Sequence, residues 1–276
     1  MRSDSRRDAE PLVTEEDLAE TYSSPYDFVD QYREAIDIHR KTGLKSSAVS
    51  SRMEGVPRSR IRTWIEGGKP DVLRGIETAR EHGWLDLDYD DSNFRCLNRL
   101  TAWIFSGGSI TKSQYKATFS VEGSEERKVI ESVFESLGLG FDTVKREAKA
   151  DEAVPDDATL LGRVLSCLGA PVGTKAHGSI TLPEYLDTDR TQVKHDFVRI
   201  YLFNRAHSRG EARGRGVGIR EERPREYLNE LAGLLREFVD DGEVSVNNKN
   251  VYVSKKGTRE LRESGLLGGD DTETLS

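Results

Sequence analysis

The segment that most constrains the fold runs from Leu97 to Val121, because the period of its hydrophobic pattern changes partway along. LNRLTAWIF predicts a short buried helix, and Gly107 and Gly108 end it. The next residues, ITKSQYKATFSV, alternate between polar and apolar, which predicts a strand with one buried face. The polar face of that strand carries Lys112, Gln114 and Lys116.

The rest of the chain continues to mix helical and strand-like segments. SEERKVIESVFESLGL, from Ser124, and ATLLGRVLSCL, from Ala158, predict helices. An LGAPVGTK turn and an LPEYL step lead to FVRIYLFNRAHSRG, which begins at Phe197. A helix PREYLNELAGLLREFV, a hairpin-like EVSVNNKNVYVS and a last helix KGTRELRESGLL follow. The pattern favours the α+β class.

A separate, all-helical domain is predicted ahead of this region, over residues 25–90. Two of its short helices flank Gly55, and Pro57 suits the first position of the second one. The buried stripe of this second helix is Ile61, Trp64 and Ile65. Its outer face carries the residues that we expect to contact DNA: Arg58, Arg60, Arg62 and Thr63. The pattern is typical of a helix-turn-helix, although an exposed amphipathic helix with solvated arginines would show it too.

The charge of the chain is unevenly distributed. The formal net charge is −8, which alone argues against a nucleic-acid partner. The acidic residues concentrate in residues 1–24, 86–91, 151–157 and the tail 269–276, and we expect the first segment to be disordered. The basic residues concentrate in 58–62 and 199–225, so local basic surfaces remain available. An acidic, Asp-rich shell suits a halophilic protein, which we treat as a hypothesis.

Several classes of protein find no support in the sequence. No apolar stretch is long enough to span a bilayer, and the N-terminal residues lack the apolar core of a signal peptide. Cys96 and Cys167 are far apart, which favours a cytoplasmic protein without disulfides. The five histidines form no spaced cluster and no phosphate-binding glycine motif occurs, so we expect neither a metal nor another cofactor.

The order of these segments resembles that of the LAGLIDADG homing endonucleases, above all the endonuclease domains inside inteins. LTAWIFSGGSI, from Leu100, lies over the first motif helix, and FVRIYLFNRAH, from Phe197, lies over the second, about a hundred residues later. The resemblance covers residues 93–268. It implies two pseudo-symmetric αββαββα repeats, 93–180 and 181–268, with saddle-shaped antiparallel sheets that hold the DNA major groove. Both repeats lie in one chain, which is compatible with a monomer.

The motifs themselves depart from the family pattern where its chemistry resides. In that family the acid before the final glycine of each motif binds a divalent metal, usually Mg²⁺, at the scissile phosphates. Gly107 and Arg205 stand at those two positions here, and Phe105 and Phe203 replace the other motif acids. The resemblance therefore implies a protein that binds double-stranded DNA without cutting it, as in the WhiA regulators of bacteria, where a degenerate scaffold joins a helix-turn-helix.

We expect Lys112, Gln114 and Lys116 to contact DNA in the first repeat, although an exposed sheet face would show the same pattern. Arginines that follow the second motif complete the predicted DNA surface. They are Arg205, Arg209, Arg213, Arg215 and Arg220. A solvated loop rich in arginine and glycine is the competing interpretation. Two other functions stay open: an active, Mg²⁺-dependent endonuclease with displaced ligands, and a protein-interaction module. The displaced ligands would be Asp196, Asp240 and Asp241, the last two following an LAGLL sequence.

Overall fold

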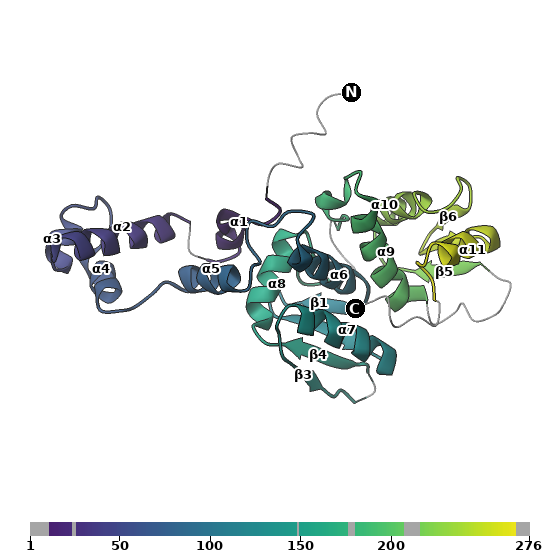
Figure 1. Cartoon of the computed structure of the whole chain (residues 1–276), viewed down its shortest axis with the longest axis horizontal. Helices are drawn as coiled ribbons and strands as arrows, with labels where there is room; N and C mark the ends of the chain where they lie inside the picture. The colour runs from purple at the N-terminus through teal and green to yellow at the C-terminus, as the bar shows by residue number, and fades with distance from the viewer. Residues whose placement is uncertain (1–10, 24–25, 148, 176–179, 207–215, 269–276) are drawn as a thin grey trace, which may run out of the picture. The chain divides into compact units, whose positions relative to one another are not determined.

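A computed structural model describes residues 11–23, 26–147, 149–175, 180–206 and 216–268. The chain divides into two compact units. One unit is Val13–Asp86, and the other contains residues 87–268 together with 11–12. The chain is α+β, as predicted, because the first unit is helical and the second combines helices with antiparallel sheets (Figure 1).

The helical unit contains five helices: α1 (Glu15–Glu20), α2 (Asp27–Thr42), α3 (Ser46–Ser50), α4 (Arg58–Ile65) and α5 (Asp71–Glu81). α2, α3 and α4 pack around a common core that includes Ala35, Val49, Met53, Ile61 and Trp64. The predicted stripe of α4 is confirmed, since Ile61 and Trp64 are buried and Ile65 packs against them. The expected domain thus begins at Val13 rather than at residue 25.

The expectation of a disordered segment over residues 1–24 is wrong from Val13 onward. Thr14 and Asp17 form a capping box at the start of α1, in which each side chain bonds the backbone N–H of the other residue. Val13, Leu18 and Ala19 are fully buried, and α1 packs against α5. The acidic composition hid a short apolar stripe that tertiary packing stabilises.

The first half of the second unit follows the predicted order of helices and strands. Its elements are α6 (Ser92–Gly107), β1 (Gly108–Ile110), β2 (Ala117–Val121), α7 (Ser124–Ser136), β3 (Phe141–Val144), β4 (Asp151–Pro155) and α8 (Ala158–Cys167). The four strands form one antiparallel sheet in the order β1-β2-β4-β3, and α6, α7 and α8 contact it (Figure 1).

The second half contains a similar series. After a short turn of 3-10 helix (Glu184–Leu186) come α9 (Thr191–Ala206), β5 (Val217–Arg220), α10 (Arg225–Arg236), β6 (Val244–Asn247), β7 (Asn250–Val253) and α11 (Lys255–Glu263). The strands pair antiparallel in the order β5-β7-β6, which matches the order β2-β4-β3 of the first sheet. Residues 207–215, between α9 and β5, lie outside the described residues.

The two apolar helices predicted from the sequence, α6 and α9, pack against each other. Near their N-terminal ends Arg95 Nε lies 2.7 Å from Asp196 Oδ2. Near their C-terminal ends Asn204 Nδ2 donates to Ser106 Oγ over 2.8 Å. Because first turns meet first turns and last turns meet last turns, the helices run parallel, and Gly107 and Arg205 lie at the same end of the pair.

One predicted strand is in fact a hairpin. The alternation from Ile110 to Val121 is interrupted by a turn, in which Thr111 N donates to Lys116 O over 3.0 Å. Tyr115 has a φ of 56°, which a strand residue does not adopt. The carbonyl of Tyr115 lies only 1.8 Å from where a Cβ at Gly162 would stand, so α8 packs directly on this turn. That packing is a long-range contact that residue alternation does not reveal.

Candidate nucleic-acid interface

The outward face of α4 carries the residues predicted for DNA contact, and three of the four are exposed. Arg58, Arg62 and Thr63 lie on the solvent side of the helix. Arg62 Nε forms an ion pair of 2.7 Å with Glu66, which raises the pKa of the Arg62 guanidinium through this hydrogen bond. An exposed pair of this kind contributes little to stability, so the guanidinium can exchange Glu66 for another anion.

Arg60 is placed differently from its neighbours. Its guanidinium carbon lies 4.0 Å from the centre of the Phe28 ring, and its Nη1 lies 3.4 Å from Gln31 Oε1. Both partners belong to α2, so the side chain of Arg60 holds α4 against α2. That Arg60 also contacts DNA stays a prediction.

The second predicted group lies at the turn of the β1–β2 hairpin, not along a strand. Lys112 and Gln114 are exposed there, and Lys116 is half-buried just before β2. The expectation that strand alternation gives these three residues a common face is therefore wrong, because the turn at residues 111–116 interrupts the strand. All three residues lie within this turn or at its end.

The outer face of the β5-β7-β6 sheet is polar across all three strands. Arg220 of β5 pairs in register with Asn250 of β7, which in turn pairs with Asn247 of β6. One row further along, the exposed Tyr252 of β7 stands opposite Ser245 of β6. Since side chains alternate across a strand, these residues share one face, and the valines and Ile219 between them are turned to the core.

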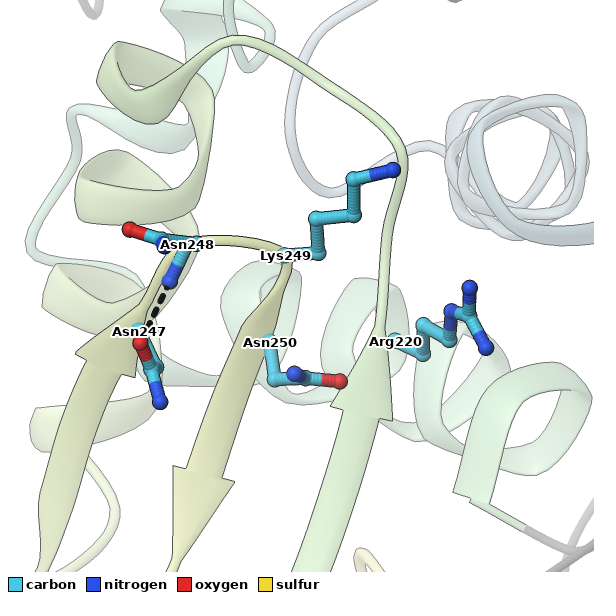
Figure 2. A pocket seen from close by; sticks show the side chains of 5 residues that line it. All are labelled: Arg220, Asn247, Asn248, Lys249 and Asn250. Atoms are coloured by element: carbon cyan, nitrogen blue, oxygen red, sulfur yellow. Dashed lines mark hydrogen bonds between the residues drawn. The ribbon is translucent and has the colours of Figure 1, made fainter.

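A surface recess lies at the end of this face, and Figure 2 shows its lining. The residues around it are Arg220, Asn247, Asn248, Lys249 and Asn250. Glu222 borders it, 3.4 Å from Lys249 Nζ and 3.5 Å from Arg220 Nη2. The hydrogen bond and charge of Lys249, with the charge of Arg220, lower the pKa of Glu222. Amide groups from β6, β7 and the turn between them, and the guanidinium of Arg220, thus lie at the same end of the sheet.

The first sheet offers a less basic outer face. Its register places Thr118 and Ser120 of β2 beside Glu152 of β4 on one side. Glu152 is neutralised by Arg146 at 2.7 Å. Among the strand residues that we predicted for DNA contact, only Arg220 is therefore described on a sheet face, while Arg209, Arg213 and Arg215 lie outside the described residues.

At the C-terminal end of the α6–α9 pair, cations surround one carboxylate. Glu221 is 3% exposed, and its two oxygens lie 3.2 Å from Arg205 Nε and 3.2 Å from Arg223 Nε. The Tyr201 hydroxyl also donates to Glu221, and Arg223 donates to the carbonyl of Phe105 in the last turn of α6. Sequence reasoning identified Arg205 here but missed Glu221 and Arg223.

Lys175 completes this cluster, and no sequence pattern pointed to it. Its Nζ donates to the carbonyls of Ile104 and Gly108, at the end of α6. Burial, together with the nearby charges of Arg223 and Arg205, lowers the pKa of Lys175 to about 7. We call Lys175, Arg205, Glu221 and Arg223 the cationic cluster.

A divalent metal does not fit this end of the helix pair. Gly107 has no side-chain ligand atom, and the carboxylate described there, Glu221, is already ion-paired with two guanidinium groups and accepts a hydrogen bond from a hydroxyl. The carboxylates proposed as displaced ligands lie elsewhere. Asp196 pairs with Arg95 and Arg99 at the opposite end of the pair, and Asp240 pairs with Lys256 at 2.5 Å beyond α10. Within the described ranges, no three His, Cys, Asp or Glu side chains are grouped for a metal.

The comparisons with known proteins give limited matches. No family model matches the chain. The replication factor C small subunit of Methanocaldococcus jannaschii is 24% identical over 212 residues, which is 67% of this chain. This chain spans only 11% of the length of that relative. Of the helices in the described ranges, none is long and apolar enough to cross a membrane.

Among solved structures, the chain is similar to a crystal structure of the N-terminal LAGLIDADG domain of DUF199/WhiA. The sequence identity is 11% and the TM-score is 0.41. The similarity covers 69% of this chain and 91% of that one.

Proposed function

We propose that this chain binds double-stranded DNA, without cutting it, on a degenerate scaffold of the homing-endonuclease type. The observation that carries the proposal is the outer face of the β5-β7-β6 sheet, where Arg220, Asn250 and Asn247 stand in one cross-strand row. Arginine pairs with the edge of guanine and asparagine with the edge of adenine, and a short antiparallel sheet can enter the major groove.

Support for the scaffold comes from the order and pairing of the elements. α6 and α9 run side by side in parallel, and each is followed by a sheet with the same strand order. This is the arrangement that two pseudo-symmetric repeats around a helix pair would produce. The saddle shape and a first strand of the later repeat, the counterpart of β1, stay part of the proposal.

A regulatory role is proposed from the helical unit. α3 and α4 are joined by a turn at Gly55, which has a φ of 76°, and both pack on α2. α4 then offers Arg58, Arg62 and Thr63 to solvent, as the second helix of a helix-turn-helix does. A chain with two candidate DNA-contacting surfaces, whose described carboxylate at the helix pair, Glu221, is already held by two guanidinium groups, suits a regulator better than a nuclease.

The substitution Arg220→Ala tests the proposed sheet contact. We expect a loss of about 1–3 kcal/mol in affinity for the preferred site, with relaxed base preference at one position. Arg259→Ala is the matched control, because Arg259 is also exposed, on α11, and like Arg220 it pairs with a neighbouring glutamate, here Glu263. Site selection from genomic fragments, followed by titration of each variant, makes the measurement. Equal affinity and unchanged base preference in both variants would remove the sheet face from the interface.

A further inference from the structure

The cationic cluster carries more positive charge than its own residues neutralise. It contains three cations, Lys175, Arg205 and Arg223, against the single carboxylate of Glu221. The neighbouring aromatic residues, Tyr201 and Tyr227, contribute hydroxyl groups but no charge at neutral pH. Burial, and after it repulsion by both guanidinium groups, lowers the pKa of Lys175 to about 7.

The hydrogen bonding of the cluster is also incomplete. The side chain of Arg223 is 3% exposed, and its Nη1 is buried without a hydrogen-bond partner among the described residues. Burying such a donor is unfavourable unless an acceptor completes it. The side chain of Arg205 is 37% exposed, although its Nε is likewise buried without a hydrogen-bond partner among the described residues, so the cluster is open to solvent along this side chain. An incoming acceptor would therefore meet Arg205 first.

The position of the cluster links it to the proposed DNA surface. Glu221 and Arg223 follow directly after β5, whose last residue is Arg220. Arg205 belongs to the last turn of α9, and Lys175 holds the end of α6. All four residues thus lie at the end of the parallel helix pair where the resembled family would bind a metal.

We infer that the cationic cluster is a phosphate-binding site in which Arg205, supported by Arg223 and Lys175, takes the place of a metal ion. Its ligand is a phosphate group, either a phosphodiester of the DNA backbone or a free phosphate ion. Guanidinium groups bind phosphate oxygens through charge-assisted hydrogen bonds. The DNA form of this inference rests on the proposed function, and the free-phosphate form does not.

The test compares the full chain with Arg205→Ala, Arg205→Lys and Arg259→Ala. In the DNA arm, the affinity for a random-sequence duplex is measured as a function of KCl concentration. Removing one phosphate contact should lower the slope of log affinity against log salt by about 1. We expect that loss in Arg205→Ala, partial retention in Arg205→Lys, which keeps the charge, and no change in Arg259→Ala.

In the second arm, the thermal midpoint is measured in inorganic phosphate and in KCl of equal ionic strength, without DNA. A ligand that binds only the folded state raises the midpoint. General salt effects act on every variant alike, so we compare the shift of each variant with that of the wild type. A shift that Arg205→Ala abolishes and Arg259→Ala keeps identifies free phosphate as a ligand.

The two arms separate the inference from the proposed function. If the wild type binds no duplex but shows the phosphate-specific shift, the proposed function fails and the phosphate site stands. If the wild type binds duplex and Arg205→Ala changes neither the salt slope nor the phosphate shift, the inference is overturned while DNA binding stands. Circular dichroism confirms that each variant is folded before either arm is interpreted.

Discussion

At the scale of single residues, Lys175 shows how an unusual pKa follows from its surroundings. An unperturbed lysine has a pKa of 10.5, and that of Lys175 is lowered to about 7 by burial and by Arg223 and Arg205. Between these two values the unfolded chain holds a proton that the folded chain has released. Stability therefore rises with pH through this window, and the electrostatic penalty of Lys175 is fully present below pH 7.

The variant Lys175→Met tests this sign. Methionine is similar in length but cannot be protonated, so the penalty disappears at every pH. We expect the free energy of unfolding of the variant, relative to the wild type, to be higher at about pH 6 than at about pH 9.5. Urea unfolding at both values makes the comparison. If the difference in the free energy of unfolding between variant and wild type does not depend on pH, the pKa of Lys175 is not lowered by its surroundings.

Two glycines give a paired prediction on packing. A Cβ at Gly162 would lie 1.8 Å from the carbonyl oxygen of Tyr115, whereas a Cβ at Gly233 of α10 meets nothing within 4 Å. Gly162→Ala should therefore destabilise the chain by about 2 kcal/mol or more, since backbone must move. Gly233→Ala should stabilise it by about 0.5–1 kcal/mol, the helix preference for alanine. Chemical denaturation measures both, and equal effects would contradict the described contact of α8 with the β1–β2 turn.

At the scale of elements, α4 carries two arginines in different surroundings. Arg62 is exposed and pairs with Glu66, while Arg60 packs over Phe28 of α2. We expect Arg62→Ala to weaken DNA binding with little change in stability, because an exposed ion pair contributes little to the folded state. Arg60→Ala should instead lower the thermal midpoint of the helical unit. Titration with duplex and thermal unfolding distinguish the two, and the reverse pattern would contradict the assignment.

Periodicity predicted most of these elements because their buried faces are local in sequence. The stripe of Ile61 and Trp64 and the buried face of α7 follow from helical spacing alone. The hairpin turn at residues 111–116 could not be read in this way, since its conformation depends on Gly162, which lies in α8. α1 was missed because a six-residue helix has too few turns to show a period, and its burial depends on α5.

The residues of the candidate site also differ in whether the sequence alone could predict them. Arg220 and the exposed arginines of α4 stand out from composition and alternation. Glu221, Arg223 and Lys175 did not, because Lys175 is far in sequence from the other two and all three come close only at the end of the folded α6–α9 pair. The signal nearest to them was the EER that follows β5, which reads as an ordinary charged loop.

At the scale of the whole molecule, we propose that the chain binds double-stranded DNA and leaves it intact. Its net charge of −8 is unusual for such a protein, and phosphate contacts weaken steeply with salt. Binding therefore depends on local features, namely the β5-β7-β6 face, α4 and the cationic cluster. Affinity should be compared at several salt concentrations rather than in one dilute buffer.

The most direct measurement incubates the full chain with genomic DNA fragments at several KCl concentrations, with and without Mg²⁺. Bound fragments are sequenced, and the same samples are assayed for strand breaks. We expect enrichment of one site, with intact strands both with and without Mg²⁺. We expect that enrichment to be lost in a variant that combines Arg62→Ala with Arg220→Ala. Mg²⁺-dependent cleavage at the enriched site, or no enrichment of any fragment, would contradict the proposal.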